Sequence, residues 1–341
     1  MTSGPRAEAA PAEAAARAAG EVALSAVICT CDRYELLAGA VESLLGQRIA
    51  GGDIEIIVVD NSRNPLGAAE FGRRYTDTPD LRYLIEPRSG LSHARNRAAQ
   101  AARGRVVAFI DDDARARPGW AQALLAAYDG HGGRAGVVGG RVVPRWPGEP
   151  PAWLDPSLLG YLSIVDLGDA IRELSPHEWL AGCNISFTRA ALLSAGGFST
   201  DLGRTATALL SNEELEATDR MREAGWLAVY APDAVVEHLI APERLTPEWF
   251  RRRAAWQAVS DALRPGADRS ELAAAAEARL DALRRGRPSP RRENGGSLKR
   301  EVDVVYNSIA LALSAGEPPG TIRAPPLGER VRTALRSLLS R

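Results

Sequence analysis

The sequence lacks several features that would place a protein in a class at once. Its formal net charge is −1 over 341 residues, so it has no excess of basic side chains of the kind that nucleic-acid-binding proteins carry. No apolar run approaches the ~20 residues that cross a bilayer. Residues 1–20 are rich in Ala and Glu rather than forming an apolar signal core. We therefore expect neither a nucleic-acid binder nor an integral membrane protein.

Cysteine is also scarce. The three cysteines, Cys29, Cys31 and Cys183, match no zinc-ligand spacing. Cys29 and Cys31 fall in or beside a predicted buried strand, where cysteine behaves as a small hydrophobic residue; a reactive thiol is the alternative. So little cysteine, with no disulfide framework, is typical of a reducing compartment, and we expect a cytoplasmic protein.

Glycine is missing where phosphate-binding loops require it. The first predicted strand, residues 23–30, is followed by Cys-Asp-Arg-Tyr, and the next glycine is Gly39. Loops that cradle triphosphates or dinucleotides place glycine directly after such a strand. The absence argues against a dinucleotide oxidoreductase and makes a sugar nucleotidyltransferase a less favoured alternative.

What the sequence does contain is an alternation of strand-like and helix-like segments. Residues 1–20 have no large apolar side chain after Met1 and predict a disordered tail. Beyond them, apolar runs predict strands at 23–30, 54–59, 81–85 and 105–110, and helical spacing predicts helices at 35–45, 91–102 and 118–128. Strands separated by helices indicate an α/β fold, with a doubly wound, mostly parallel sheet flanked by helices.

Polar side chains gather where three of these strands end. Three consecutive aspartates, Asp111, Asp112 and Asp113, follow residues 105–110. Carboxylates this close repel one another and are stable only when water or a hard cation neutralises them. The alternative is an acidic turn before a helix with Pro118 in its first turn.

The other two strands also end in polar residues, namely Thr30, Asp32 and Arg33 after the first and Asp60 and Asn61 after the second. Ligands of open α/β sheets bind at the carboxyl ends of the strands. The sequence therefore predicts one ligand crevice at this edge of the sheet.

Six segments occur in an order and spacing that can be compared with known families: SAVICTCDR (25–33), IIVVDNS (56–62), GLSHARNR (90–97), FIDDD (109–113), WLAGCNISF (179–187) and NEELE (212–216). Together they resemble a family 2 glycosyltransferase over roughly residues 23–260. The resemblance implies a GT-A type nucleotide-diphospho-sugar transferase fold. It also implies transfer of a sugar from a nucleoside-diphosphate donor to a hydroxyl acceptor, with inversion at the anomeric carbon. The chain departs from the family pattern at Cys29 and Cys31, which replace a common proline and tyrosine.

The resemblance assigns the strand-end residues to the donor. It implies that Thr30 and Asp60 contact the base and ribose, and that Arg95 lies near the base or the diphosphate. Asp111 is expected to hold ribose or a metal-bound water, and Asp112 is open between those two roles. The full set of implied donor-binding residues is Thr30, Asp32, Arg33, Asp60, Arg95, Asp111 and Asp112.

A divalent cation, Mn²⁺ or Mg²⁺, is implied by the D-x-D pair Asp111 and Asp113. A cation that bridges the diphosphate oxygens stabilises the charge that develops on the leaving group. Asp113 is expected to be the direct ligand, with Asp111 as a second member of the metal site. His238 completes the shell in one interpretation and is structural in the other.

An inverting transfer needs a general base for the acceptor hydroxyl. The family's acidic pair falls on Glu213 and Glu214, and we favour Glu214 as the base. The segment 211–225 predicts a helix with Ser211 as its N-cap. The alternative for Glu214 is therefore a capping box with Ser211, in which the glutamate only satisfies a backbone N–H.

The acceptor side is expected to include Trp179, Gly182 and Asn184, which lie in the matching part of the family pattern. Residues 144–179 are rich in proline and tryptophan and predict a long loop, which we interpret as an acceptor lid. Its aromatic rings suit sugar or lipid faces, but rings of this kind also anchor loops to a core.

Four parts are predicted along the chain: a disordered tail (1–20), a nucleotide-sugar-binding half (21–143), an acceptor-binding and catalytic half (144–262) and a basic, helical C-terminal extension (263–341). Residues 327–341 form an amphipathic basic pattern that would suit peripheral contact with an anionic membrane at the inner face of the plasma membrane. The alternative is a terminal helix that packs on the catalytic domain.

The predicted function is metal-dependent inverting glycosyl transfer in polysaccharide, glycolipid or natural-product glycosylation. A non-catalytic nucleotide-sugar-binding protein of the same fold is the main alternative. The intact acidic residues Asp111, Asp113, Glu213 and Glu214 argue against it.

Overall fold

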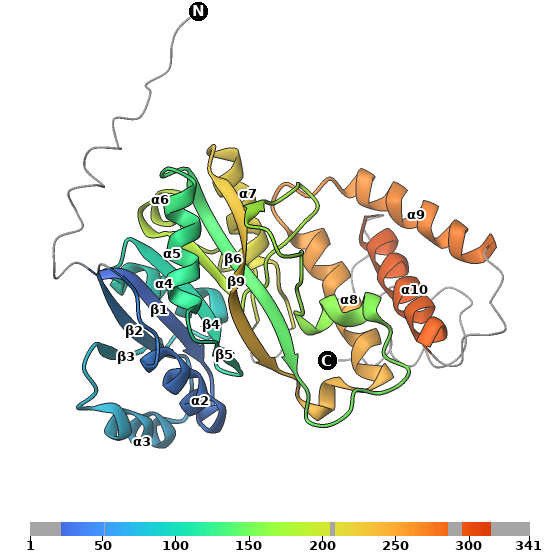
Figure 1. Cartoon of the computed structure of the whole chain (residues 1–341). Coiled ribbons are helices and arrows are strands. Elements are labelled where there is room, and N and C mark those ends of the chain that lie inside the picture. The colour runs from blue at the N-terminus through green and yellow to red at the C-terminus, as the bar shows by residue number, and fades with distance from the viewer. Residues whose placement is uncertain (1–21, 51, 205–208, 286–294, 315–341) are drawn as a thin grey trace, which may run out of the picture. The chain divides into compact units, whose positions relative to one another are not determined.

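The computed structural model describes residues 22–50, 52–204, 209–285 and 295–314 (Figure 1). These residues form two compact units. Unit 1 contains the described residues up to 143, together with 165–200 and 217–238, and unit 2 contains 144–164, 201–216 and the described residues from 239 onward. The predicted boundary at 143/144 coincides with a unit boundary, whereas the predicted half 144–262 is divided between the two units. The assignment of binding roles to these parts stays a prediction, and the predicted tail lies outside the described residues.

Unit 1 is built on a nine-stranded sheet in the described part of the chain, ordered β3-β2-β1-β4-β8-β6-β9-β5, with β7 pairing β9. The strands are β1 (Val22–Thr30), β2 (Asp53–Asp60), β3 (Leu81–Ile85), β4 (Val106–Asp111), β5 (Ala114–Ala116), β6 (Ala135–Arg145), β7 (Arg172–Glu173), β8 (Ile185–Thr188) and β9 (Leu227–Leu239). The strands from β3 to β4 pair in parallel, but β8 is antiparallel to both β4 and β6. The sheet is therefore mixed rather than mostly parallel.

The parallel part follows from the sequence pattern. Leu24, Val27 and Ile28 of β1 are fully buried, as expected for a strand covered on both faces. The helices of unit 1 are α2 (Tyr34–Leu45), α3 (Pro65–Tyr75), α4 (Leu91–Ala101), α5 (Trp120–Gly130), α6 (Arg189–Ser194) and most of α7 (Glu213–Glu223). The predicted helices at 35–45 and 91–102 are confirmed. The predicted helix start at Pro118 is wrong. Helix α5 begins at Trp120, directly after Gly119, whose φ is 86°.

Strand register aligns the polar strand ends. Thr30 is the partner of Asp60 across β1 and β2, and Cys29 is the partner of Asp111 across β1 and β4. The predicted meeting of three strand ends at one edge of the sheet is therefore confirmed.

Unit 2 is mainly helical, with η1 (Pro156–Leu162), η2 (Pro242–Arg244), α8 (Pro247–Leu263), α9 (Arg269–Arg285) and α10 (Gly295–Ser314). Thr246 caps α8, because its hydroxyl accepts the Trp249 N–H at 3.2 Å. The helical C-terminal region is confirmed by α9 and α10. The amphipathic segment 327–341 lies outside the described residues.

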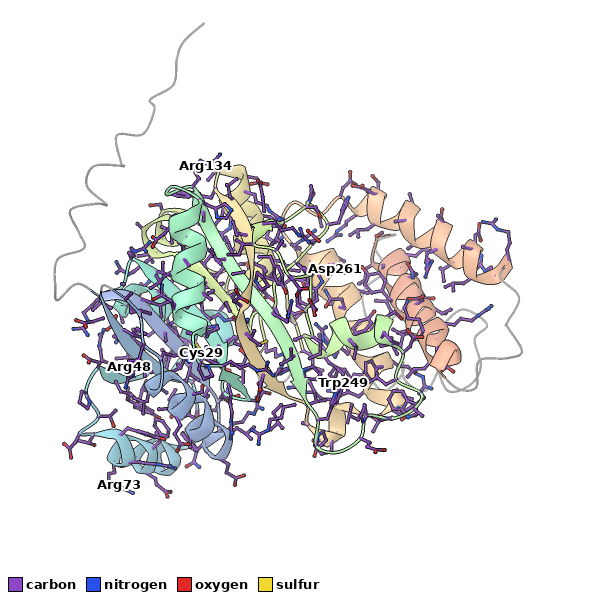
Figure 2. The ribbon with its side chains drawn as sticks, viewed as in Figure 1. Cys29, Arg48, Arg73, Arg134, Trp249 and Asp261 are labelled. Atoms are coloured by element: carbon purple, nitrogen blue, oxygen red, sulfur yellow. The ribbon has the colours of Figure 1, made fainter. Side chains whose placement is uncertain are left out.

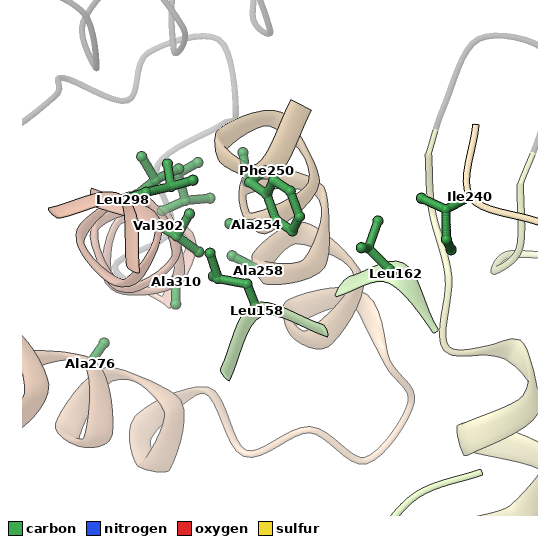
Figure 3. Close-up of a cluster of buried hydrophobic side chains, with 13 residues drawn as sticks. Leu158, Leu162, Ile240, Phe250, Ala254, Ala258, Ala276, Leu298, Val302 and Ala310 are labelled. Carbon is green, nitrogen blue, oxygen red and sulfur yellow. The ribbon is translucent and has the colours of Figure 1, made fainter. Parts of the chain in front are cut away.

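The core of unit 2 brings η1 against α8 and α10. Figure 3 shows Leu158 and Leu162 of η1, Phe250 of α8 and Val302 of α10 in one buried cluster. Trp153 also packs edge-on against Phe250, with ring centroids 5.8 Å apart. This contact favours the anchoring interpretation for the aromatic residues of the predicted lid.

The cysteines are free thiols, and two of them are less buried than predicted. Cys29 is half-buried, Cys31 is exposed just beyond β1, and Cys183 is buried. Figure 2 labels Cys29 in unit 1. Partial burial raises the pKa of the Cys31 thiol and full burial raises that of Cys183. Nearby aspartates raise both pKa values further, which disfavours a reactive thiolate. Among the described residues, no helix is both long and apolar enough to span a bilayer.

Candidate active site

The residues that follow β1 and β4 form one connected network in unit 1. The Thr30 hydroxyl donates to Asp112 at 2.8 Å. Arg33 then bridges two carboxylates, with Nη1 2.7 Å from Asp112 and Nη2 2.7 Å from Asp113. Burial raises the pKa of Asp112 to about 7, and the Asp113 charge adds to this while Arg33 opposes it. The site thus holds a concentrated negative charge that one guanidinium partly neutralises.

His238 reaches the same network from β9. Ala114 of β5 pairs with His238, and His238 Nε2 lies 3.4 Å from Asp113 Oδ1. Both side chains are 2% exposed. The structure therefore brings two of the predicted metal-site residues together.

Asp111 pairs with a different cationic residue, Arg95. Its Oδ1 lies 3.7 Å from Arg95 Nη2. Consistent with this, the described residues contain no group of three His, Cys, Asp or Glu side chains arranged to hold a metal ion. The predicted set of Asp111, Asp113 and His238 is thus not assembled as a three-ligand site.

The side-chain atoms at this site are nevertheless suitable ligands for a divalent cation. Carboxylate oxygen and imidazole nitrogen are both suitable ligands for Mn²⁺, and Mg²⁺ commonly takes only one or two carboxylates plus substrate phosphates. The Arg33 guanidinium already lies between Asp112 and Asp113 as a positive group. These carboxylates thus already pair with a positive group.

Arg95 is held rigidly on α4. It is 2% exposed, donates to the Gly182 carbonyl at 3.1 Å, and lies 5.7 Å and 5.5 Å from the ring centroids of Phe109 and Phe198. A Cβ at Gly182 would lie 2.7 Å from Arg95 Nη2, so any side chain there would force the guanidinium to move. The predicted donor residue Arg95 and the predicted acceptor-side residue Gly182 are in direct contact.

Asp60 is buried, and its carboxylate accepts several hydrogen bonds. Its carboxylate accepts the Tyr34 hydroxyl at 2.7 Å, the Ser62 N–H at 2.8 Å, and the Tyr83 hydroxyl. Burial, and after it the bond to Asp60, raise the pKa of Tyr34 to about 12, although Ser62 acts in the opposite direction. Both tyrosine rings pack on Phe71 of α3, at centroid distances of 6.5 and 5.3 Å.

Sequence reasoning missed this aromatic support. Neither α3 nor the pairing of Tyr83 with Asp60 was predicted. The available signal was weak, namely Phe71 and Tyr75 four residues apart, which is helical spacing. Their ring centroids are 4.6 Å apart.

Asn61 braces the chain that leads into α4. Its amide donates to the carbonyls of Glu86 and Arg88 at 2.6 Å each, and its oxygen accepts the Gly90 N–H at 2.8 Å. Gly90 has a φ of 133° and directly precedes α4, which carries Arg95. Asp32, by contrast, is exposed, and its N–H donates to Ser62 Oγ at 2.6 Å.

The side chain of Asn184 forms its hydrogen bonds within unit 1. Its oxygen accepts the Trp120 indole N–H at 2.8 Å, and its amide donates to the carbonyls of Arg141 (3.0 Å) and Ala234 (2.7 Å). The residue is 0% exposed. This arrangement favours a structural role over the predicted contact with an acceptor, whereas Trp179 is partly exposed.

The acidic pair lies in the first turn of α7. This helix begins at Glu213, so the predicted N-cap at Ser211 is wrong by one residue. Asn212 precedes the helix with a φ of 80°, a left-handed conformation that its side chain supports by donating to Asp261 at 2.6 Å. Glu213 is 3% exposed, and Glu213 and Glu214 both belong to unit 2.

Comparison with known proteins decides the family. The model of "Glycosyl transferase family 2" matches residues 25–183. The chain is also 31% identical over 244 residues to the glucosyl-dolichyl phosphate glucuronosyltransferase of Haloferax volcanii, covering 70% of this chain and 75% of that protein. The chain belongs to glycosyl transferase family 2. It is therefore a glycosyltransferase, as predicted.

Solved structures confirm the fold. The mannosyltransferase PcManGT of Pyrobaculum calidifontis has a TM-score of 0.52 at 18% identity, over 94% of this chain and 84% of that one. GalNAc-T7 has a TM-score of 0.55 at 16% identity, over 90% of this chain and 59% of that one. At such identities the likeness concerns the fold alone, which is the predicted GT-A type.

Proposed function

We propose that this family 2 enzyme is a metal-dependent, inverting glycosyltransferase that moves a sugar from a nucleoside-diphosphate donor to a hydroxyl acceptor. The observation that carries the proposal is the buried acidic site at the carboxyl end of the sheet. There Asp112 and Asp113 share the Arg33 guanidinium, and His238 lies beside Asp113. Diphosphate binding needs a cation at such a position.

The proposed donor site uses the strand-end residues. Thr30 and Asp60 face the nucleoside, while Arg33 and Arg95 supply positive charge for the diphosphate. Two structural neighbours support this choice of donor, because PcManGT is described in complex with GDP-Man and Mn²⁺ and GalNAc-T7 with UDP, GalNAc and Mn²⁺.

Asp113 and His238 would hold the divalent cation, with Asp111 acting through water or on the ribose. When bound, the cation neutralises the charge that develops on the leaving diphosphate. The protein's own part is to fix these carboxylates before the donor arrives. Burial of Asp112 and Asp113, which are 4% and 6% exposed, provides that fixed geometry.

Glu214 is the proposed general base, with Glu213 as the second candidate. Its carboxylate takes the proton of the acceptor hydroxyl while the hydroxyl oxygen attacks the anomeric carbon from the side opposite the diphosphate. Such an in-line attack inverts the configuration. The first turn of α7 supplies a rigid element that carries both glutamates.

The proposed acceptors are polysaccharides, glycolipids or natural products. The Haloferax relative bears a dolichyl phosphate in its name, which supports keeping a glycolipid among them. The three free thiols agree with a reducing cytoplasmic compartment.

The first test is thermal unfolding with UDP, GDP, dTDP and CDP, each with and without Mn²⁺, compared with Asp113→Ala. A ligand at ~100 times its dissociation constant adds ~2.7 kcal/mol to the folded state. We expect one diphosphate to raise the unfolding temperature only with Mn²⁺, and Asp113→Ala to abolish this shift. If no diphosphate raises the unfolding temperature with Mn²⁺, the metal–diphosphate site is wrong.

A further inference from the structure

Arg253 of α8 has an unused hydrogen-bonding group inside unit 2. Its Nη2 donates to Ser211 Oγ at 3.2 Å and to Gln257 Oε1 at 2.8 Å. Its Nη1 is buried and has no hydrogen-bond partner among the described residues. A buried guanidinium N–H without an acceptor is costly, so the geometry leaves one fork of Arg253 ready for an oxygen ligand.

The surroundings of Arg253 hold a second cation. Burial, and then the positive charge of nearby Arg204, lower the pKa of Arg253 to about 10, while Glu214 and Asp261 act in the opposite direction. The Arg204 guanidinium thus lies close enough to Arg253 to disfavour the charge of Arg253. An anion bound to Arg253 would counteract this repulsion.

The nearby carboxylate of Asp261 is already engaged. It accepts the amide of Asn212 at 2.6 Å, the amide of Gln257 at 2.9 Å and the Tyr306 hydroxyl at 2.5 Å. Figure 2 labels Asp261, which α8 carries two turns after Arg253. These bonds hold the chain before α7 in place, but they give no acceptor to Arg253 Nη1.

We propose that Arg253, together with Arg204, binds a phosphate group carried by the acceptor. The inference rests on the proposed function and deepens it by naming the acceptor class. Phosphate offers several oxygens to a planar guanidinium fork, which makes arginine well suited to it. Glu214 interacts electrostatically with Arg253, so a phosphate bound there would place the rest of the acceptor near the proposed base.

The acceptor is a more suitable source of this phosphate than the donor. Arg253, Arg204 and Glu214 all belong to unit 2, whereas the acidic strand ends and the cationic residues Arg33 and Arg95 belong to unit 1. Unit 1 therefore has its own positive groups for the donor diphosphate. A second cationic site in the unit that carries the base needs a second anion.

The experiment measures phosphate binding by calorimetry to the full chain, with Mn²⁺ and the stabilising nucleoside diphosphate present at saturation so that the donor site is filled. Three probes separate the sources of phosphate: inorganic phosphate, a hexose 1-phosphate and a short-chain isoprenyl phosphate. The variants are Arg253→Gln, Arg253→Lys and, as a matched control on the same helix, the exposed Arg252→Gln.

We expect wild type and Arg252→Gln to bind at least one probe equally well. Arg253→Gln should bind it at least tenfold more weakly, and Arg253→Lys should lie between, because lysine keeps the charge but loses the fork. The probe that binds best identifies a lipid-linked or a water-soluble acceptor. The affinity for the nucleoside diphosphate with Mn²⁺ should be unchanged in all three variants.

Two results would overturn the inference: no probe binds wild type, or Arg253→Gln binds as well as wild type. If Arg253→Gln loses its near-ultraviolet circular dichroism, Arg204→Gln replaces it, with a severalfold weaker affinity expected and an unchanged affinity counting against the site. Failure of every nucleoside diphosphate to bind would instead contradict the proposed function. Phosphate binding would then be measured without a nucleoside diphosphate.

Discussion

Arg33 is the residue whose contacts bear most directly on cation binding. It links Asp112 and Asp113 at 2.7 Å each, and its side chain is 37% exposed, so it can be displaced toward solvent. A divalent cation at Asp113 would compete for the same carboxylate oxygens. Arg33 therefore links the two carboxylates, and a cation bound there would have to displace it.

Replacing Arg33 by glutamine should make the protein more dependent on metal. Two buried carboxylates lose their ion pair with Arg33, which should cost about 1–3 kcal/mol of stability in EDTA. Mn²⁺ should then stabilise the variant more than it stabilises wild type. Thermal unfolding in EDTA and in Mn²⁺ measures both effects, with the exposed Arg73→Gln as the control. Equal Mn²⁺ stabilisation in the variant and wild type would show that Arg33 does not compete with the metal.

Gly182 is a second position where one side chain decides the geometry. Gly182→Ala places a methyl group 2.7 Å from Arg95 Nη2, and the two flanking rings leave Arg95 little room. We expect a loss of about 1–3 kcal/mol in unfolding free energy, together with weaker binding of the nucleoside diphosphate. Gly148→Ala, with nothing within 4 Å, is the matched control. An unchanged donor affinity in Gly182→Ala would remove Arg95 from the donor site.

At the scale of elements, α8 supports the first turn of α7, which carries the proposed general base. It carries Gln257 and Asp261, which hold Asn212 in its left-handed conformation directly before Glu213. The second half of α8 therefore supports the chain that leads into α7.

Removing the N-cap of α8 should test this support. Thr246→Ala loses the acceptor for the Trp249 N–H and should cost about 1 kcal/mol. Thr246→Ser keeps the hydroxyl and should stay near wild type. Urea unfolding monitored by circular dichroism measures the difference, and equal midpoints for the two variants would mean that the cap contributes nothing.

Elements with a strong local pattern could be predicted from the sequence. Apolar runs located β1 to β4, and helical spacing located α2 and α4. The missed elements have weak patterns: β5 is three residues long, and α3 contains two glycines, Gly67 and Gly72. Such elements depend on pairing with distant strands or on packing, which single-sequence patterns do not contain.

The candidate site divides in the same way. The strand-end acids were predicted because they follow apolar runs directly. The burial of Asn184 was not, since its partners Trp120 and Ala234 lie 64 and 50 residues away in sequence. The double ion pair of Arg33 also joins residues about 80 apart. Long-range contacts of this kind arise only from the complete fold.

At the scale of the whole molecule, each unit has its own buried core. Leu158 is 0% exposed in the cluster that joins η1, α8 and α10. Leu158→Ala should lower the unfolding free energy by about 2–5 kcal/mol, whereas Leu263→Ala, at a position 52% exposed, should change it little. Hydrogen exchange should place the lost protection in α8 and α10. A loss confined to β1 and β4 would contradict this assignment.

The interleaving of the two units along the chain has a consequence for biosynthesis. Unit 1 needs residues 165–200 and 217–238 to complete its sheet, after the chain has already contributed residues 144–164 to unit 2. A ribosome therefore releases β1 to β4 before β8, the strand that pairs with β4, has been translated. The nascent chain must wait with β4 unpaired along one edge until β8 emerges, so a chaperone that covers strand edges would protect this enzyme during synthesis.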